Sequence, residues 1–459
     1  MSVRGAISLL KPIAIGMLSG FVILGFIIGG LSLAKGSGGN KVAQPSESAS
    51  PSESASPSAT PTSTEAACSV AKYASAKALG ELHAMVVDYN TGATLFAVNE
   101  TSPAATASTM KLITSAVALE VLGPNFKATT RVFQDSADPG VIYLVGSGDV
   151  TLSATKAGQE SVYVGAPKLS KLAASTLSAY TGTQITKIVA DSSYFPGAQW
   201  LASWERSEQT QGYMSQVSAL QVDGDRRSAS NETSYRSTHP ETRAAKSFKA
   251  ALGEIAASAT IELGTTPDSA SEIASIKSQP ISKWIPHMLS VSDNTQAEAL
   301  ARLSAIKLGE TGDFSSISLA YKRVLTTLGI DSSDVNIADG SGLSDYNQVP
   351  PSVMIEVLKK IYAEEGDFGI IKKNLPAAGK SGTLASRFTG KNQVARGHVW
   401  AKTGWIKKGY TLAGYLKAKD GNVELFVVDA VGKVDDTAKQ AIDSLVTGFY
   451  KCGAALTNG

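Results

Sequence analysis

Strand-like segments stand at both ends of the folded part of the chain, and this arrangement restricts the fold more than any other feature. Near the N-terminal end, residues 82–98 (LHAMVVDYNTGATLFAV) read as two strands joined at an Asn-Thr-Gly turn. Near the C-terminal end, three more strands are predicted within residues 398–406, 410–418 and 422–431. We therefore predict one antiparallel sheet built from both chain ends and flanked by helices, which is an α+β fold.

The chain has two cysteines, Cys68 and Cys452, and they lie at opposite ends of the predicted folded part. Helices predicted at residues 70–79 and 435–452 would flank the sheet and bring the two thiols together. A disulfide between them is expected in an oxidising compartment. Because pairing does not follow from sequence alone, two buried or reactive thiols remain the alternative.

The N-terminal 35 residues predict attachment to a membrane. Residues 13–33 carry no charge, and about 21 helical residues span roughly the 30 Å of bilayer hydrocarbon. Arg4 and Lys11 precede this stretch and favour a cytoplasmic N-terminus. We therefore predict a cytoplasmic stub and anchor in residues 1–35, with a cleaved signal peptide ending near Ala34 as the alternative. Either way, the remaining chain works outside the cytoplasm.

Residues 36–66 are predicted to be a disordered linker. This segment repeats Pro-Ser-Glu-Ser-Ala-Ser from Pro45 and again from Pro51, and it has too few apolar side chains to form a core. Further along, residues 140–279 are rich in Ser, Thr, Gly and Ala, with short strand-like pieces, and are predicted to be an inserted, mostly β accessory region. The net charge of +2 and the lack of a basic run argue against nucleic acid as a partner.

Ser108 and Lys111 stand three residues apart in an otherwise apolar stretch, residues 103–123. On a helix, residues at this spacing share one face. An ammonium group among apolar side chains loses hydration, so the pKa of Lys111 is expected to fall and leave a fraction as free amine. Such an amine can take the proton of a serine hydroxyl, which predicts a serine nucleophile and a lysine base. Because Ser-x-x-Lys recurs elsewhere in the chain, this pair alone is more readily explained by a capping serine and a solvent-reaching lysine.

Two further motifs follow in sequence and change that interpretation. Ser292-Asp293-Asn294 precedes a predicted helix, and in isolation it would be read as a helix cap. Lys402-Thr403-Gly404 lies in a predicted strand, where a lysine, a hydroxyl and a glycine suit an extended substrate with a carboxylate. A competing Lys380-Ser381-Gly382 is flanked by Pro and Gly residues typical of a loop, so Lys402 is preferred.

The order of the three motifs resembles that of penicillin-recognising serine enzymes. More closely, the chain resembles the low-molecular-mass class C penicillin-binding proteins, the D-alanyl-D-alanine carboxypeptidase and endopeptidase family. The resemblance covers most of Cys68 to Cys452 and extends to VGSGDVTL, VSALQVDGDR, ADGSGLSDYNQVPP and GKSGTLASRF. About 184 residues separate Ser108 from Ser292, which fits a family whose additional domains lie between the first two motifs. The resemblance implies a serine transpeptidase-like catalytic domain formed by residues 67–139 and 280–459, with the accessory region between them.

The resemblance also implies catalytic roles for three residues. Ser108 resembles the nucleophile that becomes acylated, and Lys111 resembles its base. Ser292 resembles the relay that passes a proton to the leaving nitrogen.

Substrate contacts follow from the same resemblance. Asn294 would hold the amide of the substrate, and Lys402 and Thr403, beside Gly404, its terminal carboxylate. The oxyanion hole would consist of the main-chain N–H groups of Ser108 and Trp405. Trp405 departs from the small residue or threonine that many family members have, and with Lys407 and Lys408 it predicts a bulkier, more basic cleft wall.

Together these features predict a serine DD-peptidase that cleaves the terminal D-Ala-D-Ala, or a D-Ala cross-link, of peptidoglycan stem peptides through an acyl-enzyme. β-Lactams would bind covalently to the same serine. No cofactor or metal is expected, because the four histidines show no metal-ligand spacing. A β-lactamase and a non-catalytic envelope-binding module are the alternatives. The sequence does not separate carboxypeptidase from endopeptidase, which differ only in the leaving amine.

Overall fold

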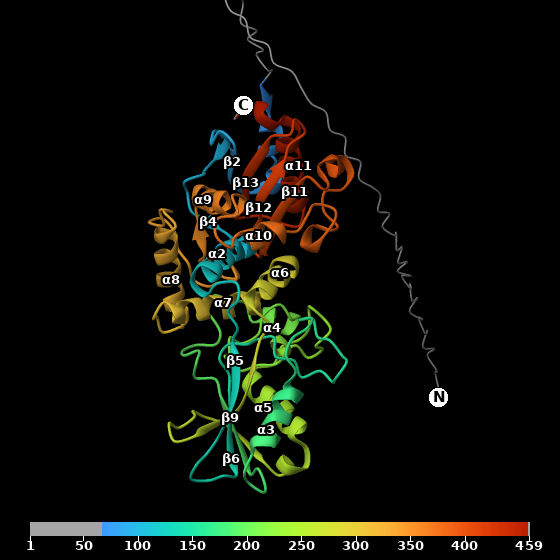
Figure 1. Ribbon diagram of the computed structural model, residues 1–459. Helices are drawn as coiled ribbons and strands as arrows, with labels where there is room; N and C mark the ends of the chain where they lie inside the picture. The colour runs from blue at the N-terminus through green and yellow to red at the C-terminus, as the bar shows by residue number, and fades with distance from the viewer. Residues whose placement is uncertain (1–66, 458–459) are drawn as a thin grey trace, which may run out of the picture. The chain divides into compact units, whose positions relative to one another are not determined.

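Two five-stranded sheets organise residues 67–457, the part of the chain that the computed structural model describes (Figure 1). The predicted anchor in residues 1–35 and the predicted linker in residues 36–66 lie outside this range. Across residues 67–457, no helix combines the length and the apolar character that crossing a membrane requires.

The first sheet is antiparallel and joins the two ends of the chain, as the strand patterns predict. Its central pairing places the C-terminal strand β13 beside the N-terminal strand β2, with Val428 opposite Ala84. The sheet order is β11 (Val399–Ile406), β12 (Gly409–Lys417), β13 (Val423–Val431), β2 (Glu81–Asp88) and β3 (Thr94–Val98). β11 is therefore an edge strand: residues 376–378 bond to the outer side of its first half, and its second half is left to face a cleft.

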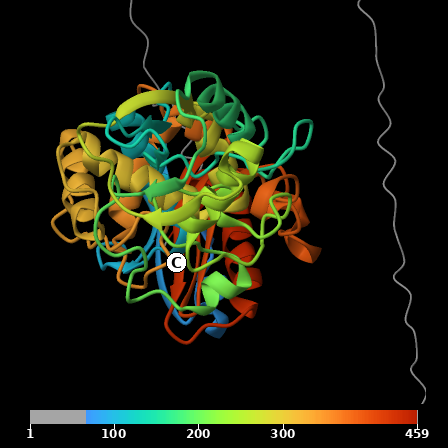
Figure 2. The same cartoon turned by 90° about the horizontal axis from the view of Figure 1, so that it is seen from below.

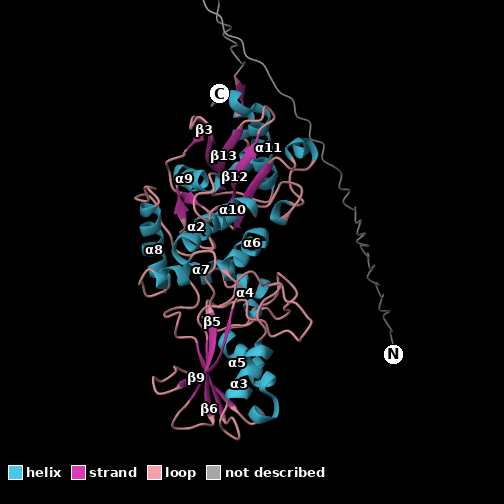
Figure 3. Ribbon diagram, viewed as in Figure 1, coloured by secondary structure: helices cyan, strands magenta, loops and turns pink. Residues whose placement is uncertain are grey.

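Helices cover both faces of this sheet (Figure 3). On one face, α11 (Thr437–Cys452) packs its apolar stripe, including Leu445 and Phe449, against Phe426 and Val428 of β13. On the other face, Leu425 and Val427 pack against a helical layer. That layer consists of α2 (Met110–Leu122), α6 (Ile281–Val291), α7 (Asn294–Lys307), α8 (Phe314–Thr327), α9 (Pro351–Tyr362) and α10 (Gly369–Lys373).

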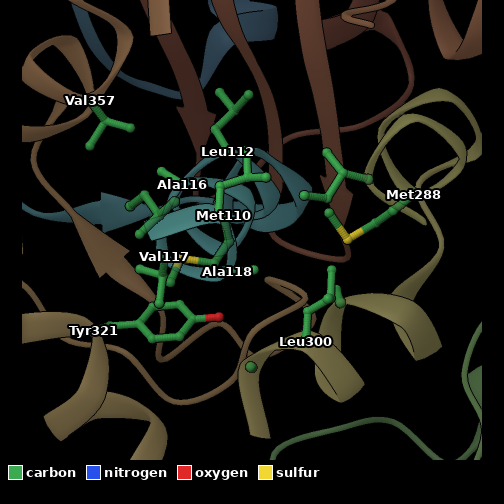
Figure 4. Packing of buried hydrophobic residues seen from close by; sticks show 14 of the residues in the cluster. Met110, Leu112, Ala116, Val117, Ala118, Met288, Leu300, Tyr321 and Val357 are labelled. Carbon is green, nitrogen blue, oxygen red and sulfur yellow. The ribbon is translucent and has the colours of Figure 1, made fainter. Parts of the chain in front are cut away.

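α2 lies at the centre of the helical layer. Its residues 110–119 are all buried, and Gly123 ends it as its sequence predicts. Figure 4 shows Met110, Leu112 and Val117 of α2 with Met288 of α6 and Leu300 of α7, and Tyr321 of α8 and Val357 of α9 lie nearby. Because it is enclosed on all sides, α2 can hold its N-terminal turn in a fixed position.

The second sheet belongs to the segment between the first and second motifs. Its order is β8 (Thr260–Leu263), β7 (Lys187–Asp191), β6 (Val141–Val145), β5 (Thr129–Gln134) and β9 (Ser271–Lys277). β5 begins before residue 140, so the sheet starts earlier in the chain than the predicted inserted region. Helices α3 (Leu169–Ala179) and α5 (Pro240–Leu252) pack on it, a helical layer that the expectation of a mostly β region did not include. Figure 2 views this end of the molecule from below.

The two ends of the described chain meet beside α11. Cys68 and Cys452 form a disulfide with their Cα atoms 5.4 Å apart, and β1 (Cys68–Ser69) pairs with β14 (Leu456–Thr457). The helix predicted at residues 70–79 is broken, because Ala76 is extended between α1 (Ala71–Ala74) and a 3-10 turn at Lys77–Leu79. The remaining short elements are β4 (Ala104–Ala105), β10 (Gln348–Val349) and α4 (Ser207–Gln211).

Candidate active site

Ser108 and Lys111 meet at the N-terminal end of α2. Ser108 lies in a 3-10 turn, Ala107–Thr109, rather than in the α-helix itself, and Lys111 lies in the first turn of α2. The Lys111 Nζ donates to Ser108 Oγ at 2.9 Å, to Asn294 Oδ1 at 2.7 Å and to the Ser341 carbonyl at 2.6 Å. Three acceptors match the three protons of an ammonium group, so the amine is held in one position beside the serine hydroxyl.

The backbone beside Ser108 is strained and tightly enclosed. Ala107 has a φ of 43°, which residues with a side chain rarely adopt. Gly404 of β11 approaches so closely that a Cβ there would lie 2.8 Å from the Ser108 amide nitrogen. The Thr411 hydroxyl of β12 donates to the Thr106 carbonyl at 2.8 Å and so holds the turn that contains Ser108. The glycine of the third motif therefore has a steric reason: it lets the edge strand lie against the serine.

Burial lowers the pKa of Lys111 to about 8, although the carboxylates of Asp339 and Glu298 oppose that shift. Glu298 is also buried, and burial with the nearby Asp339 raises its pKa to about 8. The Glu298 carboxyl accepts from the Ser341 amide at 2.7 Å, and Ser341 in turn offers its carbonyl to Lys111. At neutral pH an appreciable minority of Lys111 is thus free amine, as burial in an apolar helix predicts.

The second motif forms the corner between α6 and α7. Ser292 takes a left-handed conformation with φ 65°, and Asp293 caps α7 by accepting from the Gln296 amide at 3.0 Å. Asn294 begins α7, accepts from Lys111 and donates through Nδ2 to the Tyr213 carbonyl at 3.1 Å. The corner therefore contains a helix cap, and its two flanking residues point into the site.

The third motif lies in β11, opposite this corner. Lys402 is fully buried, and its Nζ donates to Ser292 Oγ at 3.0 Å and to the Thr403 carbonyl at 2.7 Å. Burial, with the charge of Lys111, lowers the pKa of Lys402 well below its usual value. The Thr403 hydroxyl donates to Thr383 Oγ1 at 2.7 Å. The three motifs, far apart in sequence, are thus linked by hydrogen bonds at one place.

A cavity of about 370 Å³ opens over these groups. Ser108, Ser292, Asn294, Thr403 and Trp405 line it, whereas Lys111 and Lys402 lie beneath its surface. Further lining residues that the sequence patterns did not single out are Glu208, Tyr213, Leu343, Thr383, Ser386, Arg387, Tyr410 and Lys439. Only the resemblance pointed to any of these positions: GKSGTLASRF contains Thr383, Ser386 and Arg387, and ADGSGLSDYNQVPP contains Leu343.

Trp405 is half exposed and stands between this cavity and a second one of about 380 Å³. The wall is bulky, as predicted, but its charge is balanced: Lys407 lies 3.9 Å from Glu205, and Lys408 lies 2.9 Å from Asp345. The competing Lys380-Ser381-Gly382 lies in a loop, as predicted, and its Gly382 begins the 3-10 turn Gly382–Leu384. Within residues 67–457, no group of three or more His, Cys, Asp or Glu side chains is arranged to hold a metal ion.

A helix-flanked antiparallel sheet whose edge strand faces a serine in the cavity and a buried lysine beneath it is typical of penicillin-recognising serine peptidases. The chain belongs to the D-Ala-D-Ala carboxypeptidase 3 (S13) family, whose model matches residues 66–233 and 220–450. It is therefore a serine-type DD-peptidase.

Named relatives agree with this assignment. Carboxypeptidase DacB of Mycolicibacterium smegmatis is 31% identical over 86% of this chain and 85% of its own length. The D-alanyl-D-alanine carboxypeptidase of Actinomadura sp. (strain R39) is 25% identical, over 75% of this chain and 77% of its own. The crystal structure of penicillin binding protein 4 from Haemophilus influenzae has the same fold, with a TM-score of 0.67 at 20% identity over 80% of this chain and 95% of that one.

Proposed function

We propose that Ser108 is the nucleophile of this peptidase and that Lys111 is its base. The Ser108 oxygen attacks the carbonyl carbon of the penultimate D-alanine of a stem peptide while its proton passes to the Lys111 amine. The bond to the terminal D-alanine nitrogen then breaks, and Ser108 carries the acyl group. Water attacks that ester, Lys111 returns its proton to Ser108, and the proton that the water loses restores the group that protonated the leaving amine. The observation that carries the proposal is the Lys111 amine 2.9 Å from Ser108 Oγ, with a pKa of about 8.

The leaving nitrogen needs a proton, and we assign its delivery to Ser292. The Ser292 hydroxyl lines the cavity and accepts from the buried Lys402. A proton can therefore pass from Ser292 to the leaving amine while Lys402 supplies the one that Ser292 loses. The same chemistry serves a terminal D-alanine or the amine of a cross-link, so both carboxypeptidase and endopeptidase activity fit.

Substrate positioning falls to the second and third motifs. Asn294 would hold the substrate amide through its side-chain amide, and Thr403, with Gly404 beside it, would bind the terminal carboxylate. Because the Lys402 ammonium lies beneath the cavity surface, it would act on that carboxylate through its charge and through Ser292 rather than by direct contact. The oxyanion hole would be the N–H groups of Ser108 and Trp405, and a lost donor of this type costs about 10²–10³ in rate.

The proposed substrate is the D-Ala-D-Ala end of a peptidoglycan stem peptide, and a β-lactam would acylate Ser108 as its mimic. The family assignment supports the first, and the relative from Haemophilus influenzae, whose structure was determined in complex with a novel β-lactam, supports the second. For location, the uncharged stretch of residues 13–33 supports a single membrane anchor. The linker in residues 36–66 would then hold the catalytic domain outside the membrane.

Mass spectrometry of the intact full chain with benzylpenicillin tests the proposal. We expect the mass of one penicillin to be added to the wild-type chain, to disappear in Ser108→Ala and to form far more slowly in Lys111→Ala. Ser175→Ala, on the exposed face of α3, is the matched control and should acylate normally. A rapidly released adduct would identify a β-lactamase instead, and D-alanine release from a pentapeptide by Ser108→Ala would refute the assigned nucleophile.

A further inference from the structure

Asp293 connects the second motif to the inserted segment of the chain. Its carboxylate is buried, and its Oδ2 accepts from Arg226 Nη2 at 2.8 Å and from the Tyr163 hydroxyl at 2.9 Å. Arg226 also donates to the Tyr163 oxygen at 2.6 Å, which closes a triangle of three buried side chains. Tyr163 and Arg226 both come from the long segment between Ser108 and Ser292. A residue flanked by two site residues is therefore held from outside the catalytic sheet and its helices.

The backbone before Arg226 is shaped to present that side chain. Asp223, Gly224 and Asp225 have φ values of 52°, 59° and 57°, a run of three left-handed residues of which two carry side chains. A Cβ on Gly224 would lie 2.5 Å from Arg226 Nη1 and would also overlap the Tyr163 hydroxyl. Such strain persists only where the surroundings enforce it, and it concentrates at functional sites. Here it delivers a guanidinium group to the corner between α6 and α7.

Electrostatics make this contact strong. Burial alone would raise the pKa of Asp293, but Arg226, His287 and Arg236 hold it well below its usual range, so the carboxylate stays ionised. The groups that face it are Arg226, Tyr163 and Arg236 from the inserted segment, His287 from α6, and Lys111 from α2. A buried carboxylate that loses its partner is costly, so the corner is stable only while Arg226 is in place.

We propose that Arg226 and Tyr163 are positioning residues for the reaction, which act through Asp293 to hold Ser292 and Asn294 against Lys402 and Lys111. This inference rests on the roles proposed above for Ser292 and Asn294. Ser292 sits in a left-handed conformation that it would leave if the corner relaxed, and its hydroxyl would then lose Lys402. Asn294 would turn with it and lose Lys111. The inserted segment thereby sets the rate of acylation, beyond serving as a scaffold.

Acylation of the full chain by a fluorescent penicillin, followed by rate and by pH, tests this role. In Arg226→Met we expect the second-order acylation rate to fall by up to about 10²-fold, the loss typical of a displaced catalytic group. Arg226→Lys keeps the charge but cannot donate to both Asp293 and Tyr163 as the guanidinium does, so its acylation rate should lie between those of the wild type and Arg226→Met. The acylation rate of Tyr163→Phe should fall less than that of Arg226→Met. In Arg226→Met the acidic limb of the rate profile, which Lys111 sets, should move to higher pH, because the cation that offsets the Asp293 charge is gone and the pKa of Lys111 rises.

Two further variants separate positioning from stability. Arg226→Met combined with Asp293→Asn removes both charges and keeps a capping side chain, so Tm should recover, the pH shift should vanish and acylation should stay slow. Asp191→Asn is the matched control: its buried carboxylate accepts from the Thr266 amide and hydroxyl at 2.7 Å within the inserted segment, and none of its hydrogen-bond partners belongs to the three motifs. It should lose stability while acylating normally.

The outcomes are distinguishable. A wild-type chain that forms no adduct at Ser108 would overturn the proposed function, and this inference with it. A normal wild-type adduct, with Arg226→Met acylating no more slowly than Asp191→Asn at the same loss of Tm, would overturn the inference alone. If Arg226→Met does not fold, the double variant and Tyr163→Phe decide: recovery of the wild-type rate in both would overturn it.

Discussion

Lys111 is an amine whose protonation is set by opposing influences. Burial favours the free amine, whereas Asp339 and Glu298 favour the ammonium, and the resulting pKa is about 8. If the free amine accepts the proton of Ser108, the acylation rate should rise about tenfold per pH unit below that pKa and level off above it. Stopped-flow measurement with a chromogenic β-lactam, from about pH 5.5 to about pH 9, checks this profile. A rate that is flat from low pH would exclude a titrating Lys111.

Glu298→Gln should shift the same profile. The glutamine oxygen can still accept from the Ser341 amide, so the geometry around Lys111 is retained. Removing a carboxylate that raises the pKa of Lys111 lowers that pKa, so the midpoint of the acylation profile should move to lower pH. Glu356→Gln, at an exposed carboxylate on α9 that accepts from Lys359, is the control and should leave the midpoint in place. An unchanged midpoint in Glu298→Gln would show that Glu298 carries no charge near the base.

Gly404 tests how closely β11 must approach the nucleophile. A Cβ at this position would lie 2.8 Å from the Ser108 backbone nitrogen and 2.9 Å from the Ala107 Cβ, and neither atom can move without the backbone that carries it. Gly404→Ala should therefore push the strand from the serine and lower the acylation rate by about 10²-fold, as expected for a disturbed oxyanion hole. Gly409→Ala, at the start of β12, meets only ordinary contacts at 3.5 Å and should acylate normally. Equal rates for both variants would contradict the steric argument.

At the scale of elements, strand β13 contains a buried carboxyl group, that of Glu424, which destabilises the fold when it is ionised. Glu424 stands opposite Asp88 of β2, and within the described part of the chain neither of its side-chain oxygens has a hydrogen-bond partner. Burial, with the carboxylates of Asp420 and Asp88, raises the pKa of Glu424 to about 8. The folded state therefore binds this proton more tightly than the unfolded chain does. Stability should fall as pH rises from the unfolded pKa through the folded one.

Glu424→Gln removes that dependence. We expect the variant to have a higher Tm than the wild type at about pH 8 and nearly the same Tm at about pH 3, where Glu424 is largely protonated in both the folded and the unfolded wild-type chain. Calorimetry at both values checks this, with Glu272→Gln, at a half-exposed carboxylate on β9, as the control that should show little difference. A Tm difference equal at both pH values would contradict it.

The elements differ in how far their sequence predicts them. The strands of the first sheet are apolar runs bounded by turns, so β2, β3, β11, β12 and β13 appear where the patterns place them. The 3-10 turn at Ser108 is not predictable from its residues, because Ala107 has a positive φ only where Gly342 and Gly404 pack against it. Helix propensity likewise favours one helix over residues 70–79, which tertiary contacts with α11 interrupt.

For the whole molecule, the order of the three motifs predicted that they would meet in one site. No sequence pattern indicated which residues would hold those motifs in place. Nothing near Asp293 in the sequence indicates that its partners are Arg226 and Tyr163, since such pairings depend on how the inserted segment folds back. Cleft-lining residues between the first and second motifs, such as Glu208 of α4 and Tyr213, were missed for the same reason. Local sequence patterns predict individual helices and strands, whereas the residues that support a site depend on contacts between distant parts of the chain.

The disulfide acts on the molecule as a whole because it closes a loop of 384 residues. The chain-entropy model gives about 4.7 kcal/mol for a 100-residue loop and more for a longer one. Replacing both cysteines, Cys68→Ser with Cys452→Ser, should therefore lower Tm by about 5 °C or more in calorimetry. Acylation at about 25 °C should stay normal, because Cys452 packs on the sheet face opposite α2. Dithiothreitol should lower the Tm of the wild type but not of the variant. An unchanged Tm, or an acylation rate that falls with it, would mean that the bridge does not act on the unfolded chain alone.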